Sequence, residues 1–266
     1  MILVALRRTV YEIVTSAQNA LLKEIRRAGA RGALTRQGWC LAEGPRLVSE
    51  AERSGRAVHR VVGTRTALQD YRDRLPCVEL SKSLFRTLAL TENPQGVLAL
   101  VEPPVHQEAD LFAPPPLLLI LDGVQDPGNA GTLARAAEAF GATGAVFLTG
   151  TVSPWNPKTL RASAGSLFRL PLRMGLGAGE ALEILHRRGV TVRATLPEGG
   201  RAPADLDWRG PVALVIGSEG KGVSEPFRAS AEAVHIPTRA VESLNAAVAG
   251  AILLYEAARQ RDGSRP

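Results

Sequence analysis

The stretch LLLILDGVQDPGNAGTLARAAEAFGATGAVFL, residues 117–148, decides how this chain folds. Its first five residues form a continuous apolar run, which is typical of a strand buried on both faces of a sheet. The sequence then predicts a helix over about 129–140 and a second strand over 145–148. Because parallel neighbouring strands are usually joined through a helix, this order predicts an α/β domain with a mostly parallel sheet and helices on both faces.

The alternation continues to the end of the chain and defines an expected domain over residues 117–266. Apolar runs predict further strands within 189–194, at 212–216 and at 234–236. The last helix is predicted from about Ser243 to Gln260, with apolar residues recurring on one face. Those residues are Leu244, Val248, Ile252 and Tyr255.

A proline-rich segment separates this domain from a smaller one before it. Prolines at 103–104 and 114–116 flank a polar stretch, and proline both disfavours regular structure and stiffens a connector. We therefore expect a linker over 103–116 and a smaller α/β domain over 1–102. The patterns there predict helices over 16–29, 44–54 and from 81, and strands at 39–42, 58–62, 77–80 and 96–101.

The excess positive charge lies entirely in the smaller domain. Residues 1–102 carry 16 Lys and Arg against 10 Asp and Glu, whereas residues 103–266 carry 16 of each. Since arginine suits phosphate, this asymmetry favours a part that binds a polyanion attached to a part with another task. An ordinary solvated helical surface is the alternative. The arginines considered for RNA contact are Arg26, Arg27, Arg31, Arg36 and Arg46.

Several classes of protein do not fit the composition. Hydrophobic residues make up 45% of the chain, which argues against disorder, and the apolar runs are far shorter than the ~20 residues of a membrane helix. The first ten residues lack the order of a secretory signal, so we expect a cytoplasmic protein. Cys40 and Cys77 are expected to be buried apolar residues, and the four histidines have no metal-binding spacing, so no metal is expected.

Three loops that follow strands have unusual composition. The first carries Asn129 as an expected N-cap, and Arg135 follows one turn into the helix. The second, VIGSEGKGV at 215–223, has three glycines in six residues but fits neither the P-loop pattern nor the dinucleotide fingerprint. The third leads into the last helix, with Ser243 as an expected cap and Asn245 in the first turn. The first and third loops, each taken alone, could be ordinary capped turns, whereas the glycines of the second indicate backbone wrapped closely around a ligand.

Together and in order, these loops resemble the SpoU/TrmH family of RNA ribose 2′-O-methyltransferases in the SPOUT superfamily. The resemblance rests on N-x-G-x-x-x-R at 129–135, G-S-E-G-x-G at 217–222, and I-P followed by E-S-L-N-x-x-V-A over 236–249. It covers about residues 115–260. The first part is similar to the family's substrate-binding domain at 15–19, 43–48 and 93–97.

The resemblance implies a deep trefoil knot and a homodimer with its active site at the interface. It also implies S-adenosylmethionine as cofactor, held by Thr195, Leu196, Gly217, Ile236 and Leu244. The implied substrate is structured RNA, with 23S ribosomal RNA favoured over tRNA.

The resemblance also implies the residues of the reaction. Arg135 is the candidate activator, and because arginine stays protonated we expect it to position an RNA phosphate and the hydroxyl rather than act as a base. Asn129 and Asn245 would orient the reacting groups, Glu219 would brace the loops, and Ser243 would lie near Asn245. One departure is Thr238, which stands where relatives usually have Met, in a segment that is one residue shorter and lacks glycine.

Two further functions are weighed against this one. A non-catalytic RNA-binding assembly factor could retain the fold, but the intact site motifs argue against it. A small-molecule methyltransferase or nucleotide-binding enzyme of ordinary doubly wound type is disfavoured by the basic first domain and by the missing glycine fingerprint.

Overall fold

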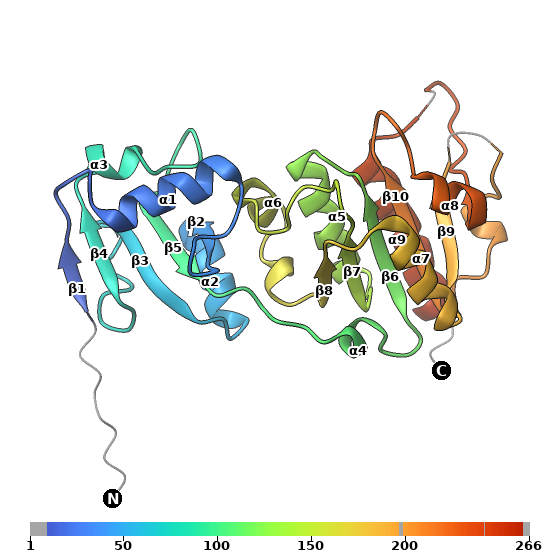
Figure 1. Cartoon of the computed structure of the whole chain (residues 1–266), viewed down its shortest axis with the longest axis horizontal. Helices are drawn as coiled ribbons and strands as arrows, with labels where there is room; N and C mark the ends of the chain where they lie inside the picture. The colour runs from blue at the N-terminus through green and yellow to red at the C-terminus, as the bar shows by residue number, and fades with distance from the viewer. Residues whose placement is uncertain (1–9, 197–198, 242, 263–266) are drawn as a thin grey trace, which may run out of the picture. The chain divides into compact units, whose positions relative to one another are not determined.

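The computed structural model describes residues 10–196, 199–241 and 243–262. The chain divides into two compact units (Figure 1). One consists of the residues up to Pro104 together with Trp155–Pro157, and the other of Val105–Pro154 and the residues from Lys158 onward.

The first unit is a mixed sheet of five strands with three helices. The strand order is β1-β4-β3-β5-β2; β1, β4 and β3 run parallel, while β5 is antiparallel to both β3 and β2. The strands are β1 (Tyr11–Ile13), β2 (Cys40–Glu43), β3 (Val58–Thr64), β4 (Cys77–Leu80) and β5 (Val97–Val101). The helices are α1 (Ala20–Arg31), α2 (Pro45–Arg53) and α3 (Lys82–Arg86).

The ends of α1 show how local chemistry sets an element. The Asn19 side chain accepts a hydrogen bond from the backbone N–H of Leu21, at 2.9 Å, and so caps the first turn. The predicted end at Gly29 is wrong, because the left-handed residue that ends the helix is Gly32, with φ of 59°. As expected, both cysteines of this unit are buried; burial raises the pKa of the Cys40 thiol to about 12 and that of Cys77 to about 11.

The second unit contains a sheet of six strands in the order β11-β9-β10-β6-β7-β8, and every pairing is parallel. The strands are β6 (Leu117–Asp122), β7 (Gly144–Phe147), β8 (Leu172–Met174), β9 (Thr191–Thr195), β10 (Val212–Gly217) and β11 (Glu232–Val234). Strands β6 and β10 are central and fully buried, as their continuous apolar runs predict. The parallel α/β architecture is confirmed.

Helices cover both faces of this sheet (Figure 1). One face packs against α7 and α8 through a core that includes Ile120, Val215, Leu185 and Phe227. On the other face α5 and α9 pack together, and Gly250 of α9 lies so close to Leu133 that a Cβ at position 250 would meet its side chain at 2.3 Å. The helices are α4 (Glu108–Leu111), α5 (Pro127–Ala139), α6 (Pro157–Ala162), α7 (Ala178–Arg187), α8 (Glu225–Ser230) and α9 (Ala246–Asp262).

Both predicted N-caps in this unit are wrong. Helix α5 begins at Pro127, because the side chain of Asp126 accepts the N–H of Asn129 at 2.7 Å and thereby caps the helix. Helix α9 begins at Ala246 instead of Ser243. There the Asn245 side chain accepts the N–H groups of Ala247 and Val248, at 2.9 and 3.2 Å.

The apolar face predicted for the last helix is largely exposed. Val248, Ile252 and Tyr255 have relative exposures of 48%, 40% and 55%. The residues of α9 that pack inward are instead Ala247, Gly250, Leu253, Leu254 and Ala257. Gly250 allows α9 to approach α5 closely, and Leu253 and Leu254 are buried beside the small residues of this inner face.

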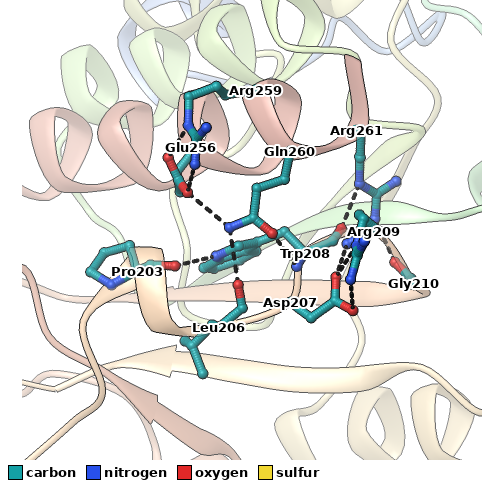
Figure 2. Close-up of polar contacts among 10 residues, drawn as sticks. All are labelled: Pro203, Leu206, Asp207, Trp208, Arg209, Gly210, Glu256, Arg259, Gln260 and Arg261. Carbon is teal, nitrogen blue, oxygen red and sulfur yellow. Dashed lines mark hydrogen bonds and ion pairs between the residues drawn. The ribbon is translucent and has the colours of Figure 1, made fainter. Parts of the chain in front are cut away.

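The C-terminal half of α9 is fastened to the segment before β10 (Figure 2). Gln260 accepts the N–H of Trp208 and donates to the carbonyl of Leu206, both at 3.0 Å. Arg261 donates to the carbonyls of Trp208 and Gly210 at 2.8 and 2.6 Å. Trp208 is fully buried, and its indole N–H donates to the carbonyl of Pro203.

A short helix interrupts the connector that the sequence predicts as irregular. Glu108 of α4 pairs with Arg173 at 2.7 Å and with Arg188 at 2.6 Å, and Leu111 is buried in the core of the second unit. The connector is therefore anchored to this unit from α4 onward. Within the described parts of the chain, no helix has the length and apolar character required to cross a membrane.

Candidate active site

A cavity of about 720 Å³ lies at the carboxyl ends of β9, β10 and β11. In parallel sheets these ends are where ligands bind, because the loops that leave them are free to vary. Three chain segments form its walls: the end of β9, the glycine-rich loop after β10, and the segment between β11 and α9. The sequence motifs at 217–222 and 236–249 thus meet in one place. Glu242, which belongs to the second of these motifs, lies outside the described residues.

The glycine-rich loop folds tightly back on the end of β10. Ser218 and Gly222 exchange backbone hydrogen bonds at 3.0 and 2.8 Å. A Cβ at Gly217 would meet the carbonyl carbon of Gly222 at 2.2 Å and the nitrogen of Val223 at 2.4 Å. No side chain fits at position 217, so backbone forms this wall of the cavity.

All five residues predicted to bind the cofactor line this cavity. They are Thr195 and Leu196 after β9, Gly217 at the end of β10, and Ile236 and Leu244 before α9. Sequence reasoning did not single out other lining residues, including Lys221, Arg228 and His235. Arg228 donates to the carbonyl of Val223 at 2.9 Å and so supports the glycine-rich loop. Lys221 lies within the glycine motif and Arg228 follows it by six residues, so nearness to that motif was the signal available.

Three predicted catalytic residues join in one hydrogen-bonded chain. Asn129 donates from its amide to the carboxylate of Glu219, and its amide oxygen accepts from Asn245 at 3.0 Å. These residues come from the β6–α5 loop, the β10–α8 loop and the start of α9. Asn245 and Glu219 also line the cavity, as does Ser243. The bonds therefore fix the two motifs around the cavity to the N-terminal turn of α5.

Arg135 lies apart from this cluster. It is exposed on α5 and does not line the cavity. Six residues separate it from Asn129, which corresponds to about 9 Å along the helix axis and about 120° around it. Among the described residues no hydrogen-bond or ion-pair partner is recorded for its guanidinium.

The arginines expected to contact RNA differ in their surroundings within the first unit. Arg31 and Arg46 are exposed, whereas Arg26 donates to Thr87 and to the carbonyl of Ala17. Arg27 and Arg36 both pair with Glu24, at 2.6 and 3.8 Å. The hydrogen bond from Arg27, reinforced by the backbone N–H of Arg36, lowers the pKa of Glu24 to about 2.

Comparison with known proteins assigns the family. The SpoU rRNA Methylase family matches residues 116–255, and the MRM3-like substrate binding domain matches residues 19–99. The chain belongs to the SpoU rRNA methylase family. It is an RNA methyltransferase that uses S-adenosylmethionine.

Three proteins similar to this SpoU methylase match over nearly their whole length. The 23S rRNA (guanosine(2553)-2′-O)-methyltransferase RlmP of Bacillus subtilis is 33% identical, with 91% of this chain and 97% of the relative covered. The crystal structure of the SpoU methyltransferase AviRb from Streptomyces viridochromogenes with AdoMet aligns with a TM-score of 0.80 at 29% identity, covering 92% of this chain and all of the other. An AdoMet-bound rRNA methyltransferase from Sinorhizobium meliloti aligns with a TM-score of 0.81 at 28% identity, over 94% and 98% of the two chains.

The cavity of this SpoU methylase fits S-adenosylmethionine. Its volume lies within the range of small-molecule pockets, ~300–1,000 Å³. Apolar side chains of Leu196, Ile236 and Leu244 lie beside backbone that no side chain obstructs at Gly217. Bound there, the cofactor supplies a methyl group activated by its sulfonium. Among the described residues no three His, Cys, Asp or Glu side chains gather as metal ligands would.

Proposed function

We propose that this SpoU methylase transfers the methyl group to a ribose 2′-hydroxyl of ribosomal RNA, with 23S RNA as the substrate. The observation that carries the proposal is the hydrogen-bonded chain Glu219–Asn129–Asn245 at the wall of the cofactor cavity. RlmP, which aligns over nearly the whole chain, is named for 2′-O-methylation of a 23S guanosine. The basic first domain supplies the charge for a large folded RNA.

In the proposed mechanism the chain's own residues orient the acceptor. The ribose hydroxyl is a weak nucleophile near neutral pH and must be polarised or deprotonated as the methyl–oxygen bond forms. Arg135 holds the adjoining phosphate and the hydroxyl through its fork of N–H donors. Asn129 and Asn245 orient the reacting groups, Glu219 braces the loops through Asn129, and Ser243 borders the same space. The precise fixing of these groups serves catalysis because transfer requires near-contact of the reacting atoms.

The proposed working form is a homodimer joined through α9. Arg135 lies outside the cavity of its own chain, so a second copy that presents its Arg135 there would complete the site. The exposed apolar residues Val248, Ile252 and Tyr255 on α9 form the face that such a copy would cover. The ring of Tyr255 already packs edge-on against Phe140, 5.7 Å between centroids, which joins α9 to the end of α5.

The proposed organisation follows the sequence divisions. Residues 1–102 bind RNA, with Arg26, Arg27, Arg31, Arg36 and Arg46 as its phosphate contacts, and 103–116 link this domain to the methyltransferase domain at 117–266. The proposed trefoil knot is formed by the segment before α9 and the loop after β10, and it is supported by the fact that both line the cofactor cavity. We place the protein in the cytoplasm, where its RNA is available.

Incubation with methyl-labelled S-adenosylmethionine tests this function. Unmodified 23S RNA and tRNA are offered separately and then digested to nucleosides. We expect label in a 2′-O-methylated nucleoside from 23S RNA. Label in tRNA alone would identify a tRNA enzyme, and cofactor binding without transfer to either RNA would favour an assembly factor.

A further inference from the structure

A second hollow, of about 390 Å³, lies beside the cofactor cavity. It is lined by residues 123–126 of the β6–α5 loop, by Gly150 after β7, and by residues 218–221 of the glycine-rich loop. Residues 218–221 also line the cofactor cavity, so the glycine-rich loop forms a wall common to both.

The position of this hollow in the sheet favours a ligand. From β6 the chain proceeds to β7 and β8 on one side of the sheet, whereas β9, β10 and β11 lie on the other side. The order therefore reverses between β6 and β10, and ligands of open α/β sheets bind outside the carboxyl ends of strands at such a switch point. Both loops that leave these two ends line the hollow.

Two glycines leave space in the hollow, and hydrogen bonds fix the loops that surround it. Gly150, with φ of 91°, has nothing within 4 Å of the place where a Cβ would stand, and Gly123, with φ of 73°, is 3.7 Å from the Ser218 side chain by the same measure. The N–H of Gly123 donates to Thr151 Oγ1 at 3.0 Å, and the N–H of Val152 donates to the carbonyl of Val124 at 2.9 Å. These hydrogen bonds join the loops after β6 and β7 and fix the distance between them.

The chemistry of the lining suits the edge of a nucleobase. Gln125 and Asp126 are exposed side chains of the lining, and Asp126 uses Oδ1 to cap α5. None of the described residues that line the hollow is aromatic, so this lining offers no ring for stacking and leaves hydrogen bonds to the base edge. A carboxylate only accepts hydrogen bonds, so it selects a base that carries an exocyclic amino group. Lys221 adds a cation for an adjoining phosphate.

We propose that this second hollow binds the amino-bearing base of the nucleotide whose ribose is methylated. The inference rests on the proposed function, because it assumes that the acceptor is a nucleotide of RNA. With the base in the second hollow and the cofactor in the first, the ribose lies over the common wall at 218–221. The Asn129–Glu219 hydrogen bond begins at this wall.

Filling the hollow tests the proposal. Gln125→Trp is expected to reduce kcat/KM for RNA at least tenfold, while the Kd for S-adenosylmethionine, measured by calorimetry, stays within about twofold. The matched control is Glu183→Trp on α7, an exposed position that lines neither cavity. An unchanged kcat/KM for Gln125→Trp would overturn the proposal, as would an equal loss in the control.

Asp126→Asn tests recognition of the base without removing the helix cap, because asparagine also caps helices well. The account predicts at least a tenfold loss of kcat/KM on the natural RNA, with the melting temperature preserved. Full activity of this variant would contradict an amino-bearing base in the hollow.

A photo-crosslinking residue at position 125 separates this proposal from the proposed function. With S-adenosylhomocysteine bound, we expect the crosslink at the nucleotide that the unmodified protein methylates, and none from position 183. A crosslink at any other nucleotide, or none, would overturn the subsite. If the unmodified protein transfers no methyl group to RNA, the proposed function fails, and a crosslink to one unpaired nucleotide would still support base binding.

Discussion

At the scale of single residues, Asn245 links stability to the site. Its side-chain oxygen caps α9 through Ala247 and Val248, and its amide donates to Asn129. The sequence identifies Asn245, Asn129 and Glu219 as site residues but not their contacts, because residues 116 positions apart are brought together only by the fold. The N-cap of α5 was assigned to Asn129 instead of Asp126 because asparagine and aspartate are both good caps, and the sequence alone does not decide between two of them three residues apart.

Arg135→Ala is expected to reduce methyl transfer at least 100-fold, because no other group would hold the phosphate and hydroxyl. The Kd for S-adenosylmethionine should not change, since Arg135 does not line the cavity of its own chain. Arg135→Lys, the control, keeps the charge but loses the planar fork and should restore only part of the rate. Single-turnover transfer and calorimetry measure the two quantities; normal turnover in Arg135→Ala would remove this residue from the mechanism.

The pairing of Glu24 makes the stability of the first unit depend on pH in the acid range. Its folded-state pKa of about 2 lies below the ordinary value, so its pairing with Arg27 stabilises the folded state fully above about pH 4.3. That contribution is lost as the pH falls from there towards 2. Hydrogen exchange of α1 amides at pH 7 and pH 3 should show a smaller loss of protection in Glu24→Gln than in the unmodified protein. The control is Glu92→Gln, an exposed position; equal acid sensitivity in all three proteins would refute this role.

At the scale of elements, the sequence predicted the strands that consist of continuous apolar runs. The buried strands β6 and β10 were found because a run of aliphatic residues is unambiguous. Strands β1 and β8 were missed because neither has a continuous apolar run: each has three residues with a charged one in the middle, Glu12 and Arg173. Helix α9 was found, but its inner face was not, because three of its five buried residues, Ala247, Gly250 and Ala257, are small and add little to an apolar pattern.

Trp208 is fully buried in the segment to which α9 is bonded, so removal of its side chain should lower the free energy of unfolding. Trp208→Ala is expected to lower the free energy of unfolding by about 3–5 kcal/mol, the usual loss for a fully buried large side chain. Trp208→Phe keeps most of the packing but loses the indole donor to Pro203, and we expect about 1–2 kcal/mol. Chemical denaturation measures both free energies of unfolding, and a loss below about 1 kcal/mol for Trp208→Ala would show that burial of the indole contributes little to stability. The bonds between Trp208 and α9 in Figure 2 use the backbone of Trp208, so both variants retain them.

At the scale of the whole molecule, the uneven distribution of charge along the chain separates a basic first part from a neutral part that contains the cofactor cavity. The first 102 residues carry the entire positive excess, while the second unit holds the cofactor cavity. Composition could reveal this separation because net charge is a property of long segments. It could not reveal the anchoring of α4, which depends on Glu108 reaching two arginines far along the chain.

A charged residue on the exposed face of α9 should abolish the proposed dimer. Ile252→Asp would place a carboxylate in the proposed apolar interface, where an unpaired charge is strongly disfavoured. Light scattering coupled to size-exclusion chromatography should report a monomer, with methyl transfer lost as well. Met174→Asp changes an equally exposed apolar residue outside that face and should remain dimeric; a dimeric Ile252→Asp would place the interface elsewhere.

The proposed acceptor at this site is a ribose hydroxyl of RNA. The most direct test uses two otherwise identical RNA fragments, one with the natural ribose and one with a 2′-deoxynucleotide at the mapped methylation position. The account predicts labelled methyl in the first fragment and only background label in the second, although both bind equally. Undiminished methylation of the deoxy fragment would contradict it, because the acceptor would then be the base or another atom.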